Sequence, residues 1–381
     1  MLRRGIDIRV IHALIFSALL FLPICCIQAQ SPVQIPTTQA QDTQRNDIGE
    51  PELGQGIRLT RQGRFRDAIP HLLAAQGHVS NEFAADFNLA LCYVATGQDK
   101  EAVQILRSVL SAGHGTAAVY NLLAQALIGV SQPDQAMGAF QQAVALDPKS
   151  EKLYIFLADA CMDHESYDLG IKIVDAGLQH LPDSGLLHYE RGIFLSLLDQ
   201  PDKARQALGR ASELAPGNII SFLADAQRGL LDANMPQAIR AARGGLRKEP
   251  ENYILLTILG QALIRQGASS GQREFEQARA VLEKSVARRP DYAPSRLALG
   301  QLYLAAGRVG EAIAQLDRAR QLAPSNPSVY SQLAAAYQRQ GNHQEAERML
   351  AALATLNQQQ AARYKLDAPD HKEGYIGSSK P

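Results

Sequence analysis

The sequence predicts an all-α protein built as a solenoid of helical hairpins, and three recurring features carry this prediction. A small residue returns every 34 residues with one longer step of 40: Ala68, Ala102, Ala136, Gly170, Ala204, Ala238, Ala278, Ala312 and Ala346. A chain-turning residue precedes most of them, namely Gly63, Gly97, Ser131, Gly267, Gly307 and Gly341. A proline follows six consecutive ones after twelve residues, at Pro148, Pro182, Pro216, Pro250, Pro290 and Pro324. Units of this length bury their apolar faces only by stacking on neighbours.

Each unit reads as two helices joined by a short turn. Leu299 and Tyr303 are separated by four residues on a first helix, and Gly300 between them allows a second helix to approach closely. Ala312 and Leu316 repeat this spacing on a second helix. Glycine in the turn between the helices and proline after the second helix end the two segments. Each unit is therefore predicted to be a helical hairpin.

These residues resemble the pattern of the tetratricopeptide repeat family, which runs Trp, Leu-Gly, Tyr, Ala, Phe and Pro at fixed offsets. The matching residues are Leu299, Gly300, Tyr303, Ala312, Leu316 and Pro324, then Leu89, Ala90, Tyr93, Ala102 and Leu106, then Leu333, Ala334, Tyr337, Ala346 and Leu350. The resemblance extends over nine tandem repeats in residues 49–360. It implies a tetratricopeptide-type α-α superhelix, which is a right-handed solenoid.

Three departures from the family pattern lead to specific expectations. The chain has no tryptophan, and aromatic residues fill that position in several repeats: Tyr120, Tyr154, Phe222 and Tyr330. In the sixth repeat, Asp225 and Gly229 stand where leucine and tyrosine are expected, so its first helix is expected to be shifted or locally loose. The seventh repeat has six extra residues within Ala268–Glu276, and we expect them to lengthen the turn between its two helices.

The N-terminus has the features of a secretory signal peptide in residues 1–29. Three arginines precede an apolar run from Val10 to Leu22, Pro23 interrupts it, and Ala29 ends a short polar stretch. The expected location is outside the cytoplasm, periplasmic or secreted. An alternative is an uncleaved membrane anchor at residues 10–27, long enough to cross a bilayer of ~30 Å. Lipidation at Cys25 or Cys26 is less favoured because no small residue precedes them.

Two further segments flank the repeats. Residues 30–48 are rich in Gln, Thr, Pro and Asp and are expected to be a flexible linker. Residues 361–381 are expected to form a disordered tail, with the last helix extending slightly past Gln360. Without the signal peptide, only Cys92 and Cys161 remain, two repeats apart, so both are expected to be buried and unpaired.

Composition and motifs argue against an enzyme. The chain has 38 basic and 38 acidic residues, so no overall field gathers nucleic acid or anionic lipid. The histidines are scattered and form neither an HExxH pair nor a Cys/His set, and no nucleophile or phosphate-binding motif is present. We expect no catalytic residues, cofactor, metal or specific small molecule. A basic cluster, Arg240, Arg243, Arg247 and Lys248, is expected to be a solvated face rather than a nucleic-acid site, because acidic residues adjoin it.

In the family, the first helix of each repeat lines a concave groove, and the resemblance implies a binding groove here. The residues eleven positions before the repeat residue, corrected for the insertion, are Gln125, Asp159, Ile193, Gln227, Gln261 and Gln301. One turn earlier lie Asn121, Ile155, Tyr189, Leu223, Thr257 and Leu297, and Arg265 lies near the end of the row. Glutamine amides both donate and accept hydrogen bonds, which suits an extended peptide backbone. Alternatively, glutamine is present only as a soluble helix former.

The sequence thus predicts a non-catalytic protein–protein interaction scaffold of the cell envelope that binds a peptide or protein segment in its groove. A membrane contact is expected only if the N-terminal segment stays uncleaved. Two alternatives remain open at this point. In the first, the chain is a recruiting or assembly subunit, either of an envelope enzyme or of a secretion or polysaccharide complex. In the second, it is a self-assembling structural solenoid.

Overall fold

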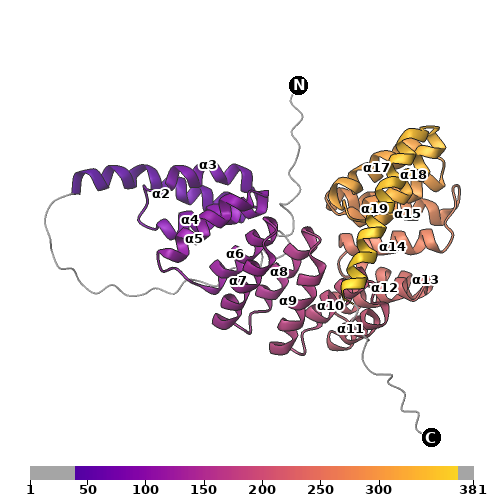
Figure 1. Ribbon diagram of the computed structural model, residues 1–381, viewed down its shortest axis with the longest axis horizontal. Coiled ribbons are helices and arrows are strands. Elements are labelled where there is room, and N and C mark those ends of the chain that lie inside the picture. Colours follow the sequence, from indigo (N-terminus) through magenta and orange to yellow (C-terminus); the bar gives the residue numbers. More distant parts are fainter. Residues whose placement is uncertain (1–38, 368–381) are drawn as a thin grey trace, which may run out of the picture. The chain divides into compact units, whose positions relative to one another are not determined.

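The computed structural model describes residues 39–367, and every regular element in this range is an α-helix. The proposed signal peptide, most of the linker and the end of the tail lie outside the described residues. Within each compact part of the chain, consecutive helices pair as antiparallel hairpins (Figure 1), with even numbers for first helices and odd numbers for second helices. In chain order they are α2 (Gln39–Arg61), α3 (Phe65–Ala75), α4 (Glu82–Thr96), α5 (Asp99–Ser111), α6 (Ala117–Gly129), α7 (Pro133–Leu146), α8 (Glu151–Asp163), α9 (Tyr167–His180), α10 (Gly185–Leu197), α11 (Pro201–Leu214), α12 (Ile219–Leu231), α13 (Met235–Leu246), α14 (Tyr253–Arg265), α15 (Arg273–Arg288), α16 (Ala293–Ala305), α17 (Val309–Leu322), α18 (Pro327–Gln340) and α19 (His343–Asp367).

The repeat register predicted from the sequence is confirmed. All nine repeat residues, from Ala68 to Ala346, lie on second helices and are buried. The six prolines lie in the turns that connect one repeat to the next, where a missing N–H costs no helical hydrogen bond. Several side chains at the family's tryptophan position bond back to the carbonyl of this proline. The hydroxyls of Tyr154 and Tyr330 donate to Pro148 and Pro324, each at 2.8 Å.

The turn between the first and second helix of every repeat contains a residue in the left-handed region of backbone space at the same repeat position, and the longer turn of the seventh repeat has a second one, Gly271. The residues at the shared position are Gly63, Gly97, Ser131, Glu165, Asp199, Ala233, Gly267, Gly307 and Gly341. The sequence indicated the glycines and Ser131, whereas the same conformation at Glu165, Asp199 and Ala233 carries no glycine signal. Side chains with a Cβ adopt this conformation at an energetic cost, so the stacked helices impose the turn in these repeats.

The helical array starts earlier than predicted and extends past Gln360 at its other end. Helix α2 begins at Gln39, inside the segment expected to be a flexible linker, so the linker prediction is wrong for residues 39–48. This stretch contains neither proline nor glycine, and nothing in it stops a helix from continuing backward from the first repeat. Helix α19 continues past Gln360, as expected, and ends at Asp367, because residues 361–366 contain good helix formers.

The sixth and seventh repeats, which depart from the family pattern in sequence, differ in how far their helices depart from it. Helix α12 of the sixth repeat begins at Ile219, 34 residues after α10 begins at Gly185, and both helices span 13 residues, so the expected shift of this helix is not present. Asp225 is tolerated in place of leucine because its carboxylate pairs with Arg228 at 3.0 Å, one turn along the same helix. In the seventh repeat, the turn between α14 and α15 covers residues 266–272, which confirms the predicted insertion.

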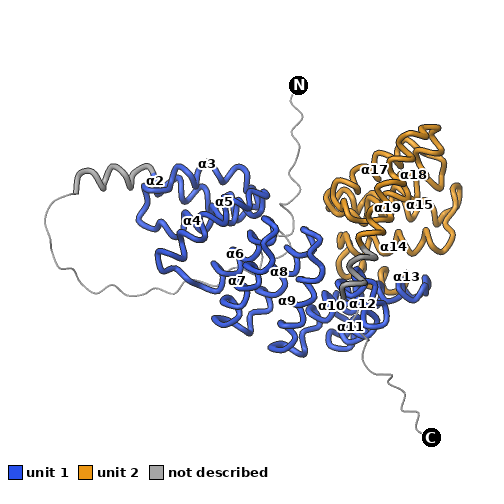
Figure 2. Tube along the Cα trace, in the orientation of Figure 1, with its two compact units in different colours: residues 1–237 blue, residues 238–381 orange. Residues whose placement is uncertain are grey.

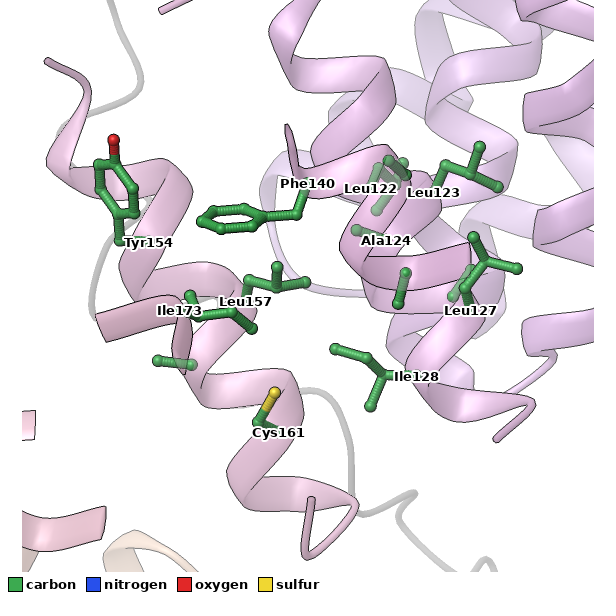
Figure 3. Packing of buried hydrophobic residues seen from close by; sticks show 14 of the residues in the cluster. Leu122, Leu123, Ala124, Leu127, Ile128, Phe140, Tyr154, Leu157, Cys161 and Ile173 are labelled. Carbon is green, nitrogen blue, oxygen red and sulfur yellow. The ribbon is translucent and has the colours of Figure 1, made fainter. Parts of the chain in front are cut away.

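From the third repeat to the fifth, and again in the seventh and eighth, the first helix buries more residues than the second helix. Helix α6 buries eight residues and α7 only four, because a first helix contacts the first helices on both sides as well as its neighbouring second helices. Figure 3 shows the result around α6 and α8, where Phe140 of α7 points toward Tyr154 and Leu157. The rings of Phe140 and Tyr154 meet edge to face with centroids 5.8 Å apart. Small side chains and interdigitated leucines fill the rest of this core.

The chain divides into two compact units, residues 1–237 and residues 238–381, shown in Figure 2. We call them unit 1 and unit 2 and describe each by itself. Unit 1 contains the first five repeats and α12, and unit 2 contains the last three repeats. The division falls within α13. Across residues 39–367, no helix combines the length and apolar character needed to span a bilayer.

Candidate functional site

The predicted groove residues fall into two rows on the first helices. The row eleven positions before the repeat residue, which we call the minus-eleven row, lies in unit 1 on α6, α8, α10 and α12 and in unit 2 on α14 and α16. All six side chains are half-buried, so each keeps an accessible part: Gln125, Asp159, Ile193, Gln227, Gln261 and Gln301. We refer to the surface carrying this row in each unit as its first-helix face.

The row one turn earlier was placed in the groove by the sequence analysis, but its side chains are buried. Its members are 2–9% exposed: Asn121, Ile155, Tyr189, Leu223, Thr257 and Leu297. In unit 1, Asn121 reaches the next first helix, and in unit 2, Thr257 reaches the second helix α15. The six residues therefore support the face from behind and offer no pocket to a ligand.

Polar members of the buried row are committed to bonds within the protein. The amide nitrogen of Asn121 donates to the carbonyl of Leu153 on the next first helix at 2.8 Å, and Gln125 donates to the Asn121 side-chain oxygen at 2.7 Å. The hydroxyl of Thr257 bonds to the backbone oxygen of Tyr253 and to the Ser285 hydroxyl, at 2.8 Å and 2.9 Å. A buried polar group needs such partners. Asn121 and Thr257 are thus structural residues, and Gln125 is partly so.

A third row, seven positions before the repeat residue, is the most exposed part of the first-helix face. In unit 1 it includes Asp163 and Leu197, and Leu197 is 46% exposed. In unit 2 it includes the predicted residue Arg265, together with Ala305 and Arg339, all exposed. One N–H of the Arg339 guanidinium donates to the carbonyl of Leu304 at 2.5 Å. This bond fixes the Arg339 side chain across α16 and α18.

Glu190 is a residue of this face that sequence reasoning missed. It precedes Ile193 by three positions on α10, so the two side chains lie on the same side of the helix. Burial raises the pKa of the Glu190 carboxyl to about 7, because removing a carboxylate from water disfavours its charged form. The signal in the sequence was that Glu190 is the one acidic residue of helix α10, which is otherwise mostly apolar.

Neither the cysteines nor the metal-ligating side chains of the described residues form a reactive group. Cys92 and Cys161 are buried and form no disulfide, as predicted. Burial raises the pKa of the Cys92 thiol to about 11 and that of Cys161 to about 12, which suppresses the nucleophilic thiolate. No set of three His, Cys, Asp or Glu side chains within residues 39–367 is arranged to hold a metal ion.

Two hollows lie away from the predicted face. In unit 1, an apolar pocket of about 380 Å³ lies between the second helices α7 and α9: Phe140, Gln141, Val144, Ala145, Pro148, Ala176 and His180 line it. In unit 2, a polar hollow of about 690 Å³ is lined by Arg243, Arg273, Glu274, Glu276 and Gln277. Neither hollow includes a residue of the minus-eleven row.

Comparison with known families agrees with the repeat pattern. Models described as tetratricopeptide repeat match residues 59–126, 127–189 and 328–359, and a model described as TPR repeat matches residues 300–341. The chain belongs to the tetratricopeptide repeat family. Tetratricopeptide repeats generally mediate protein–protein interaction and are typically non-catalytic scaffolds. No curated protein matches the chain.

Similar solved structures are tetratricopeptide proteins as well. One, from Thermus thermophilus, is 24% identical with a TM-score of 0.41, and the match covers 48% of this chain and 98% of that one. Another, from Parabacteroides merdae, is 15% identical with a TM-score of 0.44, and the match covers 76% of this chain and 99% of that one.

Proposed function

We propose that this tetratricopeptide protein is a non-catalytic scaffold that binds a peptide or protein segment on its first-helix face. The observation that carries the proposal is the minus-eleven row. At one and the same repeat position, six successive first helices present a half-buried side chain, and four of these are glutamine. A half-buried side chain has a fixed base and an accessible tip, which suits recognition better than a fully mobile one because less entropy is lost on binding.

The spacing of the row supports an extended ligand. Within each unit, successive first helices pack ~8–10 Å apart, and an extended chain advances ~3.3 Å per residue, so each repeat faces about three residues of peptide. Glutamine tips donate and accept, so they pair with backbone N–H and C=O groups of any sequence. Ile193 and Leu197 of α10 add apolar contact surface in unit 1. Burial of apolar surface then supplies much of the affinity.

The site of action is proposed to be the cell envelope. This proposal rests on the N-terminal sequence, where arginines precede an apolar run and a short polar stretch ends at Ala29. Fusing residues 1–29 to an enzyme that is active only after export tests it. Activity with a mature N-terminus after Ala29 supports a cleaved signal. Activity with an intact N-terminus supports the anchor at residues 10–27, and no activity rejects export.

The groove proposal is tested with two matched triple variants of the full chain. Q227A/Q261A/Q301A removes three amides from the minus-eleven row, and Q104A/Q206A/Q321A removes three exposed amides from second helices. Both variants are expected to keep the helical content and unfolding midpoint of the unchanged protein. Partners captured from an envelope extract are identified by mass spectrometry, and their affinities are then measured with the purified partner.

A partner whose binding is weakened by the first variant and not by the second supports recognition on the first-helix face. Equal binding by all three proteins places the site elsewhere, on second helices or in the tails. Concentration-dependent assembly of the protein without any partner favours a structural role instead.

A further inference from the structure

The second helix of the sixth repeat carries a row of arginines that no other repeat has. The positions two, five and nine residues after the repeat residue hold Arg240, Arg243 and Arg247, and all three are exposed. Every other second helix has at most one cation at these positions. The backbone N–H of Arg247 bonds to the carbonyl of Arg243, so helical geometry continues just past the end of α13. Because an α-helix turns once in ~3.6 residues, these spacings place the three side chains on one side of the helix.

Further cations adjoin this row within unit 2. Arg273 is the first residue of α15, and it lines the polar hollow of about 690 Å³ together with Arg243. One N–H of Arg243 donates to the side-chain oxygen of Gln277 on α15 at 2.9 Å, which fixes Arg243 between the two helices. Both Arg273 and Lys248, which follows the row in the chain, are exposed. We call these five residues the α13 patch: Arg240, Arg243, Arg247, Lys248 and Arg273.

The arginines of the α13 patch have no carboxylate partner, unlike many arginines of unit 2. Within the described residues, Arg240, Arg247 and Arg273 form no ion pair, and the partner of Arg243 is a neutral amide. Their charges are therefore available to an external ligand. Six arginines outside the patch do form ion pairs: Arg279, Arg288, Arg289, Arg308, Arg320 and Arg348.

Neighbouring carboxylates neutralise only part of this charge. Glu251, which adjoins the cluster in the sequence, and Glu276, which lines the hollow, form ion pairs with other arginines of α15. Glu249 accepts a hydrogen bond from an asparagine amide, and Glu274 lines the hollow. These last two carboxylates form no ion pair within the described residues, so they offset two of the five cations. The α13 patch keeps a net positive charge, which creates a local potential in a chain that is neutral overall.

The side chains between the arginines favour an anionic surface over a folded partner. They are small, namely Ala241, Ala242, Gly244 and Gly245, and no large apolar or aromatic side chain is exposed in residues 238–248. Protein interfaces draw much of their affinity from aromatic and apolar anchors, and single-stranded nucleic acids stack their bases on aromatic rings. The α13 patch offers neither. Anionic lipid headgroups require only basic charge close to the membrane surface.

We infer that the α13 patch binds the surface of a membrane rich in anionic lipids through the phosphate groups of their headgroups. Arg240, Arg247 and Arg273 contact the phosphates, and Gln277 holds Arg243 in position beside them. The choice of a membrane rests on the proposed envelope location. The α13 patch contains no residue of the first-helix face, so membrane contact and peptide binding use different residues.

The test measures binding of the full chain to two kinds of vesicle of equal size. One kind is phosphatidylcholine alone, and the other contains about 30% phosphatidylglycerol, an anionic lipid. Co-sedimentation gives a partition coefficient for the unchanged protein and for each variant. R240E/R247E reverses two charges of the patch, R240Q/R247Q removes them, and K100E/K172E reverses two exposed lysines on second helices of unit 1 as the matched control. Circular dichroism and unfolding midpoints establish that each variant is folded.

A second measurement reports on individual arginines and does not depend on how the N-terminal apolar run binds. Phenylglyoxal modifies arginine side chains in the presence of each kind of vesicle, and mass spectrometry gives the rate at each residue. Arg107 on α5 is the control for Arg243, because it has the same repeat position and likewise donates to a glutamine of the next second helix, Gln135. The positions that correspond to Arg240 and Arg247 hold no cation on α5.

Anionic vesicles are expected to bind the unchanged protein more strongly than neutral vesicles, and to slow modification of the patch arginines but not of Arg107. R240Q/R247Q should lower the partition coefficient about tenfold, R240E/R247E should lower it further, and K100E/K172E should leave it nearly unchanged. Raising the salt from about 0.05 M to about 0.5 M should release the protein, because salt screens exposed charges. Q227A/Q261A/Q301A should bind the vesicles as the unchanged protein does.

Three results would overturn the inference. Equal modification of the patch arginines with both kinds of vesicle identifies the patch as a solvated face. Equal binding of R240E/R247E and the unchanged protein to anionic vesicles moves the membrane contact to another part of the chain. A duplex oligonucleotide or polyglutamate that binds the patch more tightly and displaces the vesicles makes nucleic acid or an acidic protein segment the ligand.

None of these results affects the proposed peptide-binding function, which is tested with the glutamine variants. Absence of export in the fusion experiment rejects the envelope location, and a positive vesicle result then still supports binding to an anionic membrane.

Discussion

At the scale of single residues, the repeat pattern is kept even where one of its members changes. Gly170 replaces the repeat alanine in the fourth repeat, and the reason lies in the next repeat. A methyl group at Gly170 would overlap the ring of Phe194 on α10. In the eighth and ninth repeats, the position of Phe194 holds Leu302 and Ala336, and the preceding repeat residues are the alanines Ala278 and Ala312. Gly170 and Phe194 therefore form a complementary pair.

Replacing Gly170 by alanine is predicted to destabilise unit 1. The gain in helix propensity, ~1 kcal/mol, is outweighed by overpacking against a fully buried ring, which costs ~1–3 kcal/mol. Urea unfolding of G170A, F194L and the double variant G170A/F194L measures the coupling between them. The loss of unfolding free energy in the double variant should be smaller than the sum of the losses in the two single variants. Strict additivity would contradict the proposed pairing.

The carboxyl of Glu190 makes stability depend on pH. Burial raises its pKa from 4.5 to about 7, so the fold favours the protonated form. The associated stability is present below the unfolded value near 4.5 and is lost as the pH rises toward 7. Glu190→Gln keeps a neutral side chain at every pH. It is predicted to raise the urea midpoint at about pH 8 and to change it less at about pH 5. A larger gain at the lower pH would show that Glu190 is stabilised as a carboxylate.

At the scale of elements, the hairpin turn carries strain that differs between repeats. Ala233 holds a left-handed conformation with φ of 51°, whereas Gly307 adopts the same region at 74° without a Cβ. Ala233→Gly is predicted to stabilise the protein by about 0.5–1 kcal/mol, because the relief of strain exceeds the added chain entropy. Gly307→Ala is predicted to destabilise it by a similar amount. Chemical denaturation measures both changes in unfolding free energy. If both substitutions stabilise the protein, or both destabilise it, the proposed strain at this turn position is refuted.

Helix pairing and register were predictable from the sequence because a solenoid repeats one local solution. Small residues at Ala68 through Ala346 mark the same contact nine times, and the prolines mark where each repeat ends. The burial of Ile155 or Leu223 was not predictable in this way. Whether an apolar residue on a first helix faces solvent or the next helix depends on the angle between helices, which spacing along the chain does not encode. The start of α2 at Gln39 was missed because polar composition was taken as a sign of disorder.

The candidate site was predicted in part. Residues of the minus-eleven row are half-buried, as a binding position requires. Glu190 was not predicted, because the burial of its carboxyl becomes visible only in the structure. Opposite charge on the first helices of the two units is visible in the sequence once helix boundaries are known. Counting charges over the whole chain concealed it, because the excess of acidic residues on α4, α8, α10 and α12 of unit 1 offsets the arginines of α14 and α18.

At the scale of the whole molecule, a destabilising substitution in one repeat of a stack lowers the stability mainly of the repeats that contact it. Ala204 is fully buried and packs with Leu195 and Ala207. Ala204→Leu is predicted to cost ~1–3 kcal/mol by overpacking. Its effect on amide hydrogen exchange should be greatest in α10, α11 and α12, which contact one another, and small in α16 to α19 of unit 2. Ala314→Leu, on an exposed position of α17, is the control and should change exchange little.

The distribution of faster exchange decides how the nine repeats share their stability. If protection falls in unit 1 while unit 2 keeps its own, each unit unfolds on its own, and a ligand bound to the first-helix face of unit 2 would raise protection there alone, by an amount set by its concentration relative to its Kd. If Ala204→Leu lowers protection in both units equally, the chain unfolds as one cooperative body. A ligand on either face would then protect all nine repeats together.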